Sequence, residues 1–195
     1  MTNKLFSTTL LILLLSTFFG FSGCTTIVDA TTSEPIELSP EERSFGTYID
    51  DKRLQVIVAV NIRKADPTLK KSNIQVNSYN GVILLTGQVP THELRTLAAK
   101  TGAKVNSVRQ VHNELQVKGN TSLLTRTSDT WLATKVKASL IGSEDIKDTA
   151  IKVIVEDGVV YLMGMVAQDV ANLAANLVSN TGGVKEVVRV FEYVQ

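Results

Sequence analysis

The sequence predicts an α+β protein built from two tandem units. Each unit has the order helix, strand, strand, helix, strand, with a three-stranded mixed sheet packed against two helices. Two observations predict this fold: a pattern of about 70 residues occurs twice, and each copy carries an Asn-Gly or Asp-Gly pair between alternating apolar runs. With 195 residues, 44% of them apolar and 20% charged, the composition excludes a disordered tail, a disulfide-stapled mini-protein and a polytopic membrane protein.

The first 23 residues have the pattern of a signal peptide. Lys4 precedes an uncharged run from Leu5 to Gly23, and the small residues Ser22 and Gly23 stand directly before Cys24, the single cysteine of the chain. An uncleaved membrane anchor is the alternative, because these 19 uncharged residues lie near the lower limit for spanning a bilayer. The small residues favour cleavage, so we expect the mature protein to begin at Cys24.

The segment Phe21-Ser22-Gly23-Cys24 resembles the bacterial lipobox, although Phe21 stands where leucine or a small aliphatic residue is usual. The resemblance implies that Cys24 is diacylated, becomes the new N-terminus and is then commonly acylated again. Thr25 follows the cysteine, where an aspartate would resemble the inner-membrane retention signal of enterobacteria. The resemblance therefore implies export to the outer membrane.

Residues 25–44 have the composition of a solvated tether, with Pro35, Pro40 and several acidic residues. As a flexible coil of about 20 residues, this tether would place a folded domain roughly 25 Å from the lipid anchor. We therefore divide the chain into five segments. They are a signal peptide at 1–23, an acylated N-terminus and tether at 24–47, a first domain at 48–118, a linker at 119–127 and a second domain at 128–195.

Positive charge is concentrated in the first domain, although the formal net charge of the chain is only +1. Residues 24–47 carry five acids and one base, residues 48–118 carry eleven bases and five acids, and residues 126–195 carry seven bases and nine acids. Long-range attraction to anionic lipid would favour the first domain. The sequence alone favours a simpler interpretation over a second lipid site, namely a solvated surface or attraction to the acidic tether and second domain.

Each copy of the repeat contains a β-hairpin, and the two hairpins align at a shift of 77 positions. Asn80-Gly81 and Asp157-Gly158 predict two-residue turns of type I′, which need positive φ at both central residues. Each second strand is expected to end at a glycine, Gly87 or Gly164, with an amphipathic helix after it. These six residues are the predicted structural turn positions.

The first helix of each copy is predicted from the spacing of apolar residues. Residues 128–141 begin with Ser128 as the expected N-cap and have apolar side chains at i, i+4 and i+8, namely Leu132, Val136 and Leu140. The matching run, Leu54 to Ile62, is rich in β-branched residues and would pass for a strand, but its repeat partner indicates a helix. Because this run is apolar on nearly all sides, we expect its outer face to be covered, with the other domain as the candidate cover.

A second helix and a closing strand complete each copy. The apolar positions of the two helices are Leu94, Leu97, Ala98, Thr101 and Val105, then Val170, Leu173, Ala174 and Leu177. The apolar positions of the closing strands, which share one parity in each strand, are Val111, Leu115 and Val117, then Val187, Phe191 and Tyr193.

The duplicated hairpin and glycine pattern resembles the BON domain, and the signal peptide, lipobox and two such domains together resemble the DolP (YraP) family of outer-membrane lipoproteins. The most specific matching segments are Asp129 to Lys137 and Tyr161 to Gly164. The resemblance implies a non-enzymatic protein on the periplasmic face of the outer membrane of a Gram-negative bacterium. It further implies binding to anionic phospholipids such as phosphatidylglycerol and cardiolipin, gathering at division sites and support of envelope integrity.

In that family the lipid surface lies on the first helix of the second domain, which here is residues 128–141. Opposite the stripe expected to face the sheet, this helix carries two apolar side chains and two lysines, which suit an interfacial helix because indole prefers the headgroup level and lysine stems can snorkel. The predicted phospholipid-binding residues are Trp131, Thr134, Lys135, Lys137, Ala138 and Ile141. The alternative is a tryptophan packed against the neighbouring domain, with two solvated lysines.

The residues give little support for catalysis. The chain lacks a nucleophile motif and a Gly-rich phosphate loop, and Cys24, His92 and His112 are too few soft ligands for a structural metal site, so no catalytic residue, metal or cofactor is predicted. The adjacent carboxylates Asp50-Asp51 and Glu144-Asp145 are interpreted as solvated charge. Nucleic-acid binding is not expected either, because the basic first domain lacks interleaved aromatic residues.

The alternative function is that of a periplasmic protein-interaction adaptor. In this hypothesis the face around Trp131, or the basic first domain, would bind an envelope protein such as the outer-membrane assembly machinery or a regulator of cell-wall amidases. Binding to protein-free vesicles separates the two hypotheses.

Overall fold

The structure is a computed structural model that describes residues 45–146 and 150–194. All described helices and strands belong to one compact unit. The predicted signal peptide, Cys24 and the predicted tether as far as residue 44 lie outside the described residues.

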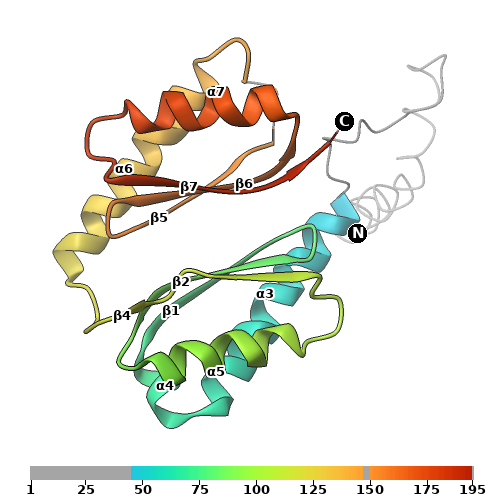
Figure 1. Cartoon of the computed structure of the whole chain (residues 1–195), viewed down its shortest axis with the longest axis vertical. Coiled ribbons are helices and arrows are strands. Elements are labelled where there is room, and N and C mark those ends of the chain that lie inside the picture. Colours follow the sequence, from blue (N-terminus) through green and yellow to red (C-terminus); the bar gives the residue numbers. More distant parts are fainter. Residues whose placement is uncertain (1–44, 147–149, 195) are drawn as a thin grey trace, which may run out of the picture. The chain divides into compact units, whose positions relative to one another are not determined.

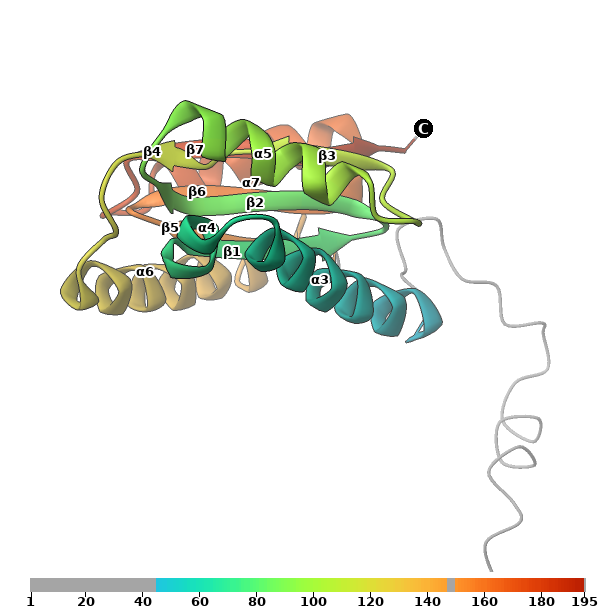
Figure 2. The same ribbon diagram turned by 90° about the horizontal axis from the view of Figure 1, so that it is seen from below.

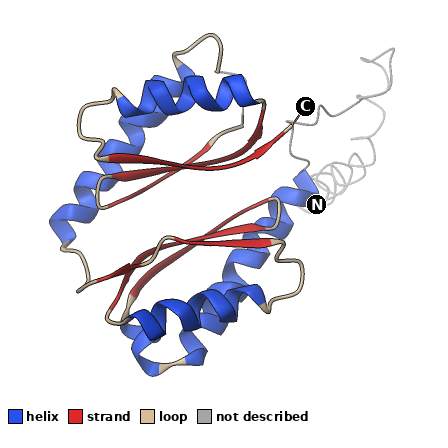
Figure 3. Cartoon of the chain, in the orientation of Figure 1, coloured by secondary structure: helices blue, strands red, loops and turns tan. Residues whose placement is uncertain are grey.

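The order of helices and strands confirms the predicted α+β repeat (Figures 1 and 3). The first copy has one additional short helix and a closing strand divided in two. Its elements are α3 (Phe45–Ala65), α4 (Pro67–Lys71), β1 (Asn73–Tyr79), β2 (Val82–Val89), α5 (His92–Ala103), β3 (Gln110–Asn113) and β4 (Gln116–Val117). The second copy consists of α6 (Leu123–Ile141), β5 (Lys152–Glu156), β6 (Val159–Val166), α7 (Gln168–Ser179) and β7 (Glu186–Tyr193).

Both sheets are mixed, as predicted. In the second sheet β5 pairs antiparallel and β7 pairs parallel with the central strand β6. In the first sheet β1 pairs antiparallel with β2, while β3 and β4 both pair parallel with it. Because β3 faces Val82 to Leu85 and β4 faces Gln88 and Val89, the two short strands follow each other along the same edge of β2.

The two hairpin turns have the backbone that type I′ requires. Asn80 and Gly81 have φ of 52° and 76°, and Asp157 and Gly158 have φ of 51° and 76°. The turn prediction is therefore confirmed at these four positions.

The prediction that each second strand ends at a glycine is wrong. Gly87 and Gly164 lie within β2 and β6, which continue to Val89 and Val166. Gly87 is nevertheless special, because its φ is 113° and a Cβ atom there would lie 1.9 Å from the carbonyl oxygen of Asn73. Glycine is needed here because the neighbouring strand approaches closely. In the sequence, this glycine was interpreted as the end of the strand.

Helix α6 begins earlier than predicted. Its N-cap is Ser122, whose hydroxyl accepts a hydrogen bond from the Thr125 amide at 3.2 Å, and the expected N-cap Ser128 lies inside the helix. Residues 123–127 of the predicted linker are therefore helical. The repeat shift of 78 relates the first residues of α6 and α3, Leu123 and Phe45, so the two helices begin at corresponding positions.

Each domain has its own core beneath its helices. Leu132, Val136 and Leu140 of α6 are buried on the second sheet, and Leu54, Val58 and Ile62 of α3 are buried on the first sheet. The two predicted inward stripes are thus confirmed.

A third apolar cluster joins the two domains through the opposite faces of their sheets. It contains Tyr79, Val82 and Leu84 from the first sheet and Ile154, Val159, Tyr161, Met163 and Val190 from the second. Strand β2 is buried at every position, because helices cover one of its faces and the second sheet covers the other. The strands of the two sheets make the apolar contact between the domains.

The outer face of α3 is open to solvent, so the prediction that another part of the protein covers it is wrong. Val56 is 63% exposed and Ile49 is 47% exposed, and Ile57 and Val60 are also exposed. The run Leu54 to Ile62 is apolar on most sides, but the apolar surface used for domain contact lies on the sheet instead.

Candidate functional site

The predicted lipid-binding side chains lie on the solvent face of α6. Trp131 is 70% exposed and Ile141 is 69% exposed, and Thr134 and Ala138 are exposed between them. The alternative interpretation, in which Trp131 packs against the neighbouring domain, does not agree with this exposure.

The exposed apolar surface of α6 continues toward its N-terminus. Leu123 and Leu124 are 79% and 81% exposed. At about 100° per residue they fall within the same arc of about 100° as Trp131 and Ile141. We call Leu123, Leu124, Trp131, Thr134, Ala138 and Ile141 the α6 stripe. It runs the whole helix, about 27 Å at 1.5 Å per residue.

The two leucines were missed because the expected helix began at Ser128. The signal that could have found them is Ser122, an N-cap residue type that directly precedes Leu123 and Leu124. Starting the helix there places both leucines on the face that the sequence had already assigned to Trp131.

Two lysines flank the α6 stripe, one on each side. Lys137 is exposed, and Lys135 is exposed while its ammonium donates a hydrogen bond to the carbonyl of Gly182 at 2.8 Å. The hydrogen bond holds the Lys135 side chain over the loop that follows α7. Both cations therefore stand beside the apolar stripe, as an interfacial helix requires.

The single acidic residue of α6, Asp129, points away from the stripe. Its carboxylate accepts hydrogen bonds from the backbone amides of Asp157 at 2.8 Å and Gly158 at 2.9 Å, which are the two central residues of the second hairpin turn. The same contact that fixes the turn removes the negative charge from the solvent face. The exposed face of α6 is consequently apolar and basic without an acid.

Asp51 of α3 makes the equivalent contact in the first domain. Its carboxylate accepts from the amides of Asn80 at 2.7 Å and Gly81 at 3.0 Å, and from the hydroxyl of Ser78 at 2.6 Å. The interpretation of Asp50-Asp51 as solvated charge is therefore wrong for Asp51, which is 3% exposed, although Asp50 is exposed. This buried carboxylate has a structural role, because its hydrogen bonds join α3 to the hairpin turn.

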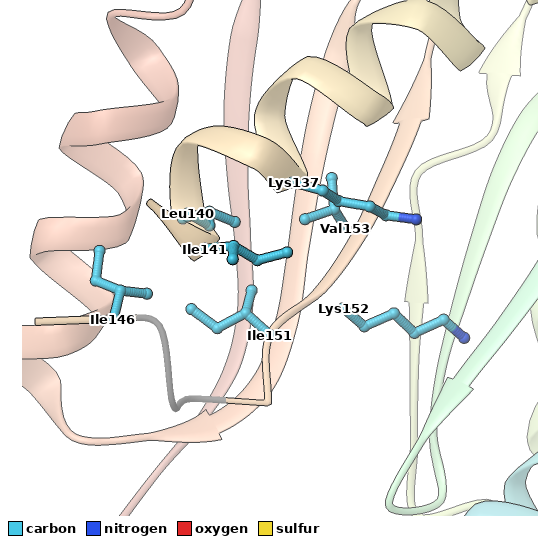
Figure 4. A pocket seen from close by; sticks show the side chains of 7 residues that line it. All are labelled: Lys137, Leu140, Ile141, Ile146, Ile151, Lys152 and Val153. Carbon is cyan, nitrogen blue, oxygen red and sulfur yellow. The ribbon is translucent and has the colours of Figure 1, made fainter. Parts of the chain in front are cut away.

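A small apolar hollow lies beside the C-terminal end of the α6 stripe (Figure 4). It encloses about 340 Å³ and is lined by Lys137, Leu140, Ile141, Ile146, Ile151, Lys152 and Val153. In Figure 4 the four leucine and isoleucine side chains gather on one side, and the ammonium groups of Lys137 and Lys152 point away from them in the same direction. Apolar surface and positive charge thus meet again at this end of the helix.

Polar contacts fix the second domain, and with it α6, against the first domain. Glu156 of β5 is buried and accepts hydrogen bonds from the side-chain amides of Gln88 at 2.6 Å, Gln75 at 2.9 Å and Asn73 at 3.3 Å. Burial raises the pKa of the Glu156 carboxyl, and the hydrogen bond from Gln88 opposes that shift.

Two basic residues of the first domain form ion pairs with the second domain. Arg109 pairs with Glu192 at 2.7 Å, and Lys118 pairs with Asp157. Hydrogen bonds from Lys118 and Lys185 lower the pKa of the Asp157 carboxyl. The expected attraction between the basic first domain and the second domain therefore exists, but at two specific positions.

The described residues contain no group of three or more His, Cys, Asp or Glu side chains that could hold a metal ion. His92 is exposed at the start of α5, and His112 is partly buried in β3. Glu144 and Asp145 are exposed in the loop after α6. None of the described helices is long and apolar enough to span a bilayer.

Comparison with known proteins adds a family assignment to this geometry. The BON domain model matches residues 50–119 and 128–195. The chain is 36% identical over 185 residues to the outer membrane lipoprotein DolP of Haemophilus influenzae, with 95% of each chain covered. It is 34% identical over 155 residues to the 21 kDa hemolysin of Actinobacillus pleuropneumoniae, with 80% of each covered. It is 28% identical over 145 residues to the osmotically-inducible protein Y of Escherichia coli, covering 73% of this chain and 72% of that one.

Proposed function

This chain belongs to the BON-domain family, in the DolP group of proteins with two such domains, and we propose that it is a non-enzymatic lipoprotein that binds anionic phospholipid through the α6 stripe. The observation that carries the proposal is the acid-free outer face of α6, where Trp131 is 70% exposed. A large exposed indole in an apolar stripe has no role in the protein's own core, and it suits the level of lipid headgroups.

The stripe would bind a membrane weakly by itself. Two lysines near an anionic surface contribute roughly 1 kcal/mol each, and partial insertion of Trp131, Ile141 and the two leucines adds a few kcal/mol. An acylated Cys24 would hold the protein at the membrane, where a high effective concentration makes such weak contacts sufficient. The stripe would then determine the orientation and residence of the domain, while the acyl chains provide the anchor.

The proposed location is the periplasmic face of the outer membrane of a Gram-negative bacterium. It is supported by the lipobox-like segment that ends in Cys24 and by the similarity to a protein named as an outer membrane lipoprotein. With the family resemblance, this location extends the proposal to a role in envelope integrity at division sites, with phosphatidylglycerol and cardiolipin as the anionic lipids bound.

The test is co-sedimentation of the soluble mature protein, lacking Cys24, with vesicles of phosphatidylcholine alone or with added phosphatidylglycerol or cardiolipin. We expect binding only to the anionic vesicles. Trp131→Glu should weaken it by roughly 30-fold or more, because the change removes an inserted ring and adds charge of the wrong sign. Leu173→Glu is the matched control, since Leu173 is an exposed apolar residue on α7, outside the stripe.

Absence of wild-type binding even at low salt would refute the proposal. The exposed stripe would then favour the adaptor hypothesis, with a periplasmic protein as the partner of the same surface, such as the outer-membrane assembly machinery or an amidase regulator. Equal losses in Trp131→Glu and Leu173→Glu would also refute it, because the effect would then come from added charge alone.

A further inference from the structure

The solvent face of α3 combines apolar and basic side chains along one arc. At about 100° per residue, seven residues fall within an arc of about 120° opposite the buried Leu54, Val58 and Ile62. We call them the α3 face. They are Ile49, Lys52, Arg53, Val56, Val60, Arg63 and Lys64, and all seven are exposed.

The α3 face carries four positive charges and no negative charge. The only acids of α3 are Asp50, which lies outside the arc, and Asp51, which is buried against the hairpin turn. Among the residues that the structure describes, Arg53, Arg63 and Lys64 have no ion-pair partner. They differ in this from Arg109 and Lys118, whose charges are used in contact with the second domain.

The position of α3 in the unit limits what could cover this face. Figure 2 shows α3 and α6 along the same side of the unit Leu38–Gln195, with α5 and α7 along the opposite side. Along the chain, α3 begins at Phe45, 21 residues after Cys24. If Cys24 is acylated and the segment between them is a flexible coil, its root-mean-square span is roughly 25 Å, so α3 is on average close to the bilayer that holds the anchor.

From the charge, the exposed apolar residues and the short distance along the chain to the anchor, we infer that the α3 face is a second contact site for an anionic phospholipid bilayer. This inference rests on the proposed function and extends it to both domains. The basic first domain adds long-range electrostatic attraction to the local attraction of Lys135 and Lys137, whose own domain has a net negative charge, and the α6 stripe supplies most of the insertion.

A protein partner is the competing occupant of the α3 face. The four cations form two pairs, Lys52-Arg53 and Arg63-Lys64, with Val56 and Val60 of the α3 face between them and no acid within the arc. Such spread-out charge fits a diffuse anionic surface better than a specific protein site. Vesicles free of protein therefore provide the decisive test.

The experiment uses the soluble mature chain, lacking Cys24, and vesicles of phosphatidylcholine with phosphatidylglycerol. The test variant is Arg53→Gln with Lys64→Gln. We expect its affinity for the vesicles to fall roughly 10- to 30-fold, about fivefold for each charge removed from the surface of an anionic membrane. The matched control is Lys100→Gln with Lys104→Gln, which removes the same charge from exposed positions in and after α5 of the same domain. It should change the affinity by less than about twofold.

A fluorescence measurement tests the contact directly, because Trp131 is the only tryptophan in the chain. In a Trp131→Phe background, Val56→Trp places a single indole on the α3 face, and Leu173→Trp places one on α7 as control. Vesicles with brominated acyl chains should quench the fluorescence of the Val56→Trp variant and leave that of the Leu173→Trp variant unchanged.

The outcomes distinguish failure of this inference from failure of the proposed function. If Trp131→Glu abolishes binding while the α3 double variant binds like wild type and Val56→Trp is not quenched, the α6 function stands and the α3 inference is wrong. If neither Trp131→Glu nor the α3 variant changes binding, both are wrong. Equal losses in the α3 variant and its α5 control would also overturn the inference, since net charge alone would account for them.

Discussion

Replacing Asp51 by alanine should destabilise the first domain far more than replacing its neighbour Asp50. Asp51 is 3% exposed and accepts three hydrogen bonds of 2.6 to 3.0 Å, two of them from the backbone amides of the hairpin turn. Asp50, the preceding residue of the same helix, is exposed. The pair therefore compares one chemical change in two environments.

The expected magnitude follows from the donors that lose their acceptor. A hydrogen bond to a charged group contributes about 1.5 to 3 kcal/mol, and a buried donor left unsatisfied costs about 1 to 3 kcal/mol. Because Asn80 and Gly81 of the turn are only partly buried, water can replace part of the loss, and we expect Asp51→Ala to lower the free energy of unfolding by about 3 to 4 kcal/mol. Asp51→Asn keeps one acceptor oxygen but places an NH2 donor against a donor of the turn, so it should also destabilise the domain clearly. Asp50→Ala should change stability by less than about 0.5 kcal/mol.

The assay is urea unfolding of the soluble mature chain, followed by circular dichroism, for wild type and the three variants. The m-value should stay constant, so that a shift in midpoint reports a change in stability. Equal midpoints for Asp51→Ala and Asp50→Ala would refute the reasoning, because the carboxylate would then contribute nothing through its contacts with the turn.

Three further predictions concern other parts of the structure. Gly87→Ala should cost about 3 kcal/mol or more in urea unfolding, because its φ is 113° and a Cβ would lie 1.9 Å from a carbonyl oxygen; Gly164→Ala, where the corresponding distance is 3.2 Å, should cost much less. Burial raises the pKa of Glu156 in the folded protein above its unfolded pKa of about 4.5. The protonated carboxyl therefore contributes to stability below the unfolded pKa, and this contribution is lost as pH rises through the folded-state pKa. Wild type should therefore lose stability relative to Glu156→Gln as pH rises above about 4.5, and parallel curves would contradict this. Leu124→Glu should lower the affinity for anionic vesicles in co-sedimentation by roughly tenfold or more, without lowering stability, since Leu124 is 81% exposed. If this variant binds as tightly as wild type, the lipid-binding surface begins only at Trp131.

Local features of the fold could be predicted because they depend on a few neighbouring residues. The type I′ turns follow from Asn80-Gly81 and Asp157-Gly158, since few other residue pairs tolerate positive φ at both positions. The exposure of Trp131 opposite Leu132, Val136 and Leu140 follows in the same way from helical geometry.

Features that depend on distant contacts could not be predicted. Helical geometry places Asp51 on the side of Leu54 and Val58, but nothing in the neighbouring residues shows that its carboxylate meets a turn 30 residues away along the chain. The prediction that the outer face of α3 is covered was wrong for the same reason. An apolar run such as Val56 to Val60 and an apolar strand such as β2 look equally suited to burial. Only the packing of the two sheets decides that the strand is covered and the helix is not.

Because the two sheets pack on each other, neither domain should be a well-behaved monomer without the other. Tyr161, Met163 and Val190 face the first sheet. Cutting the chain between the domains would expose this apolar face to solvent, and exposed apolar patches promote association. A half-molecule made of residues 119–195 should therefore self-associate or need detergent. The two halves should also unfold in a single cooperative transition, so that damage to one hairpin reduces the lifetime of both.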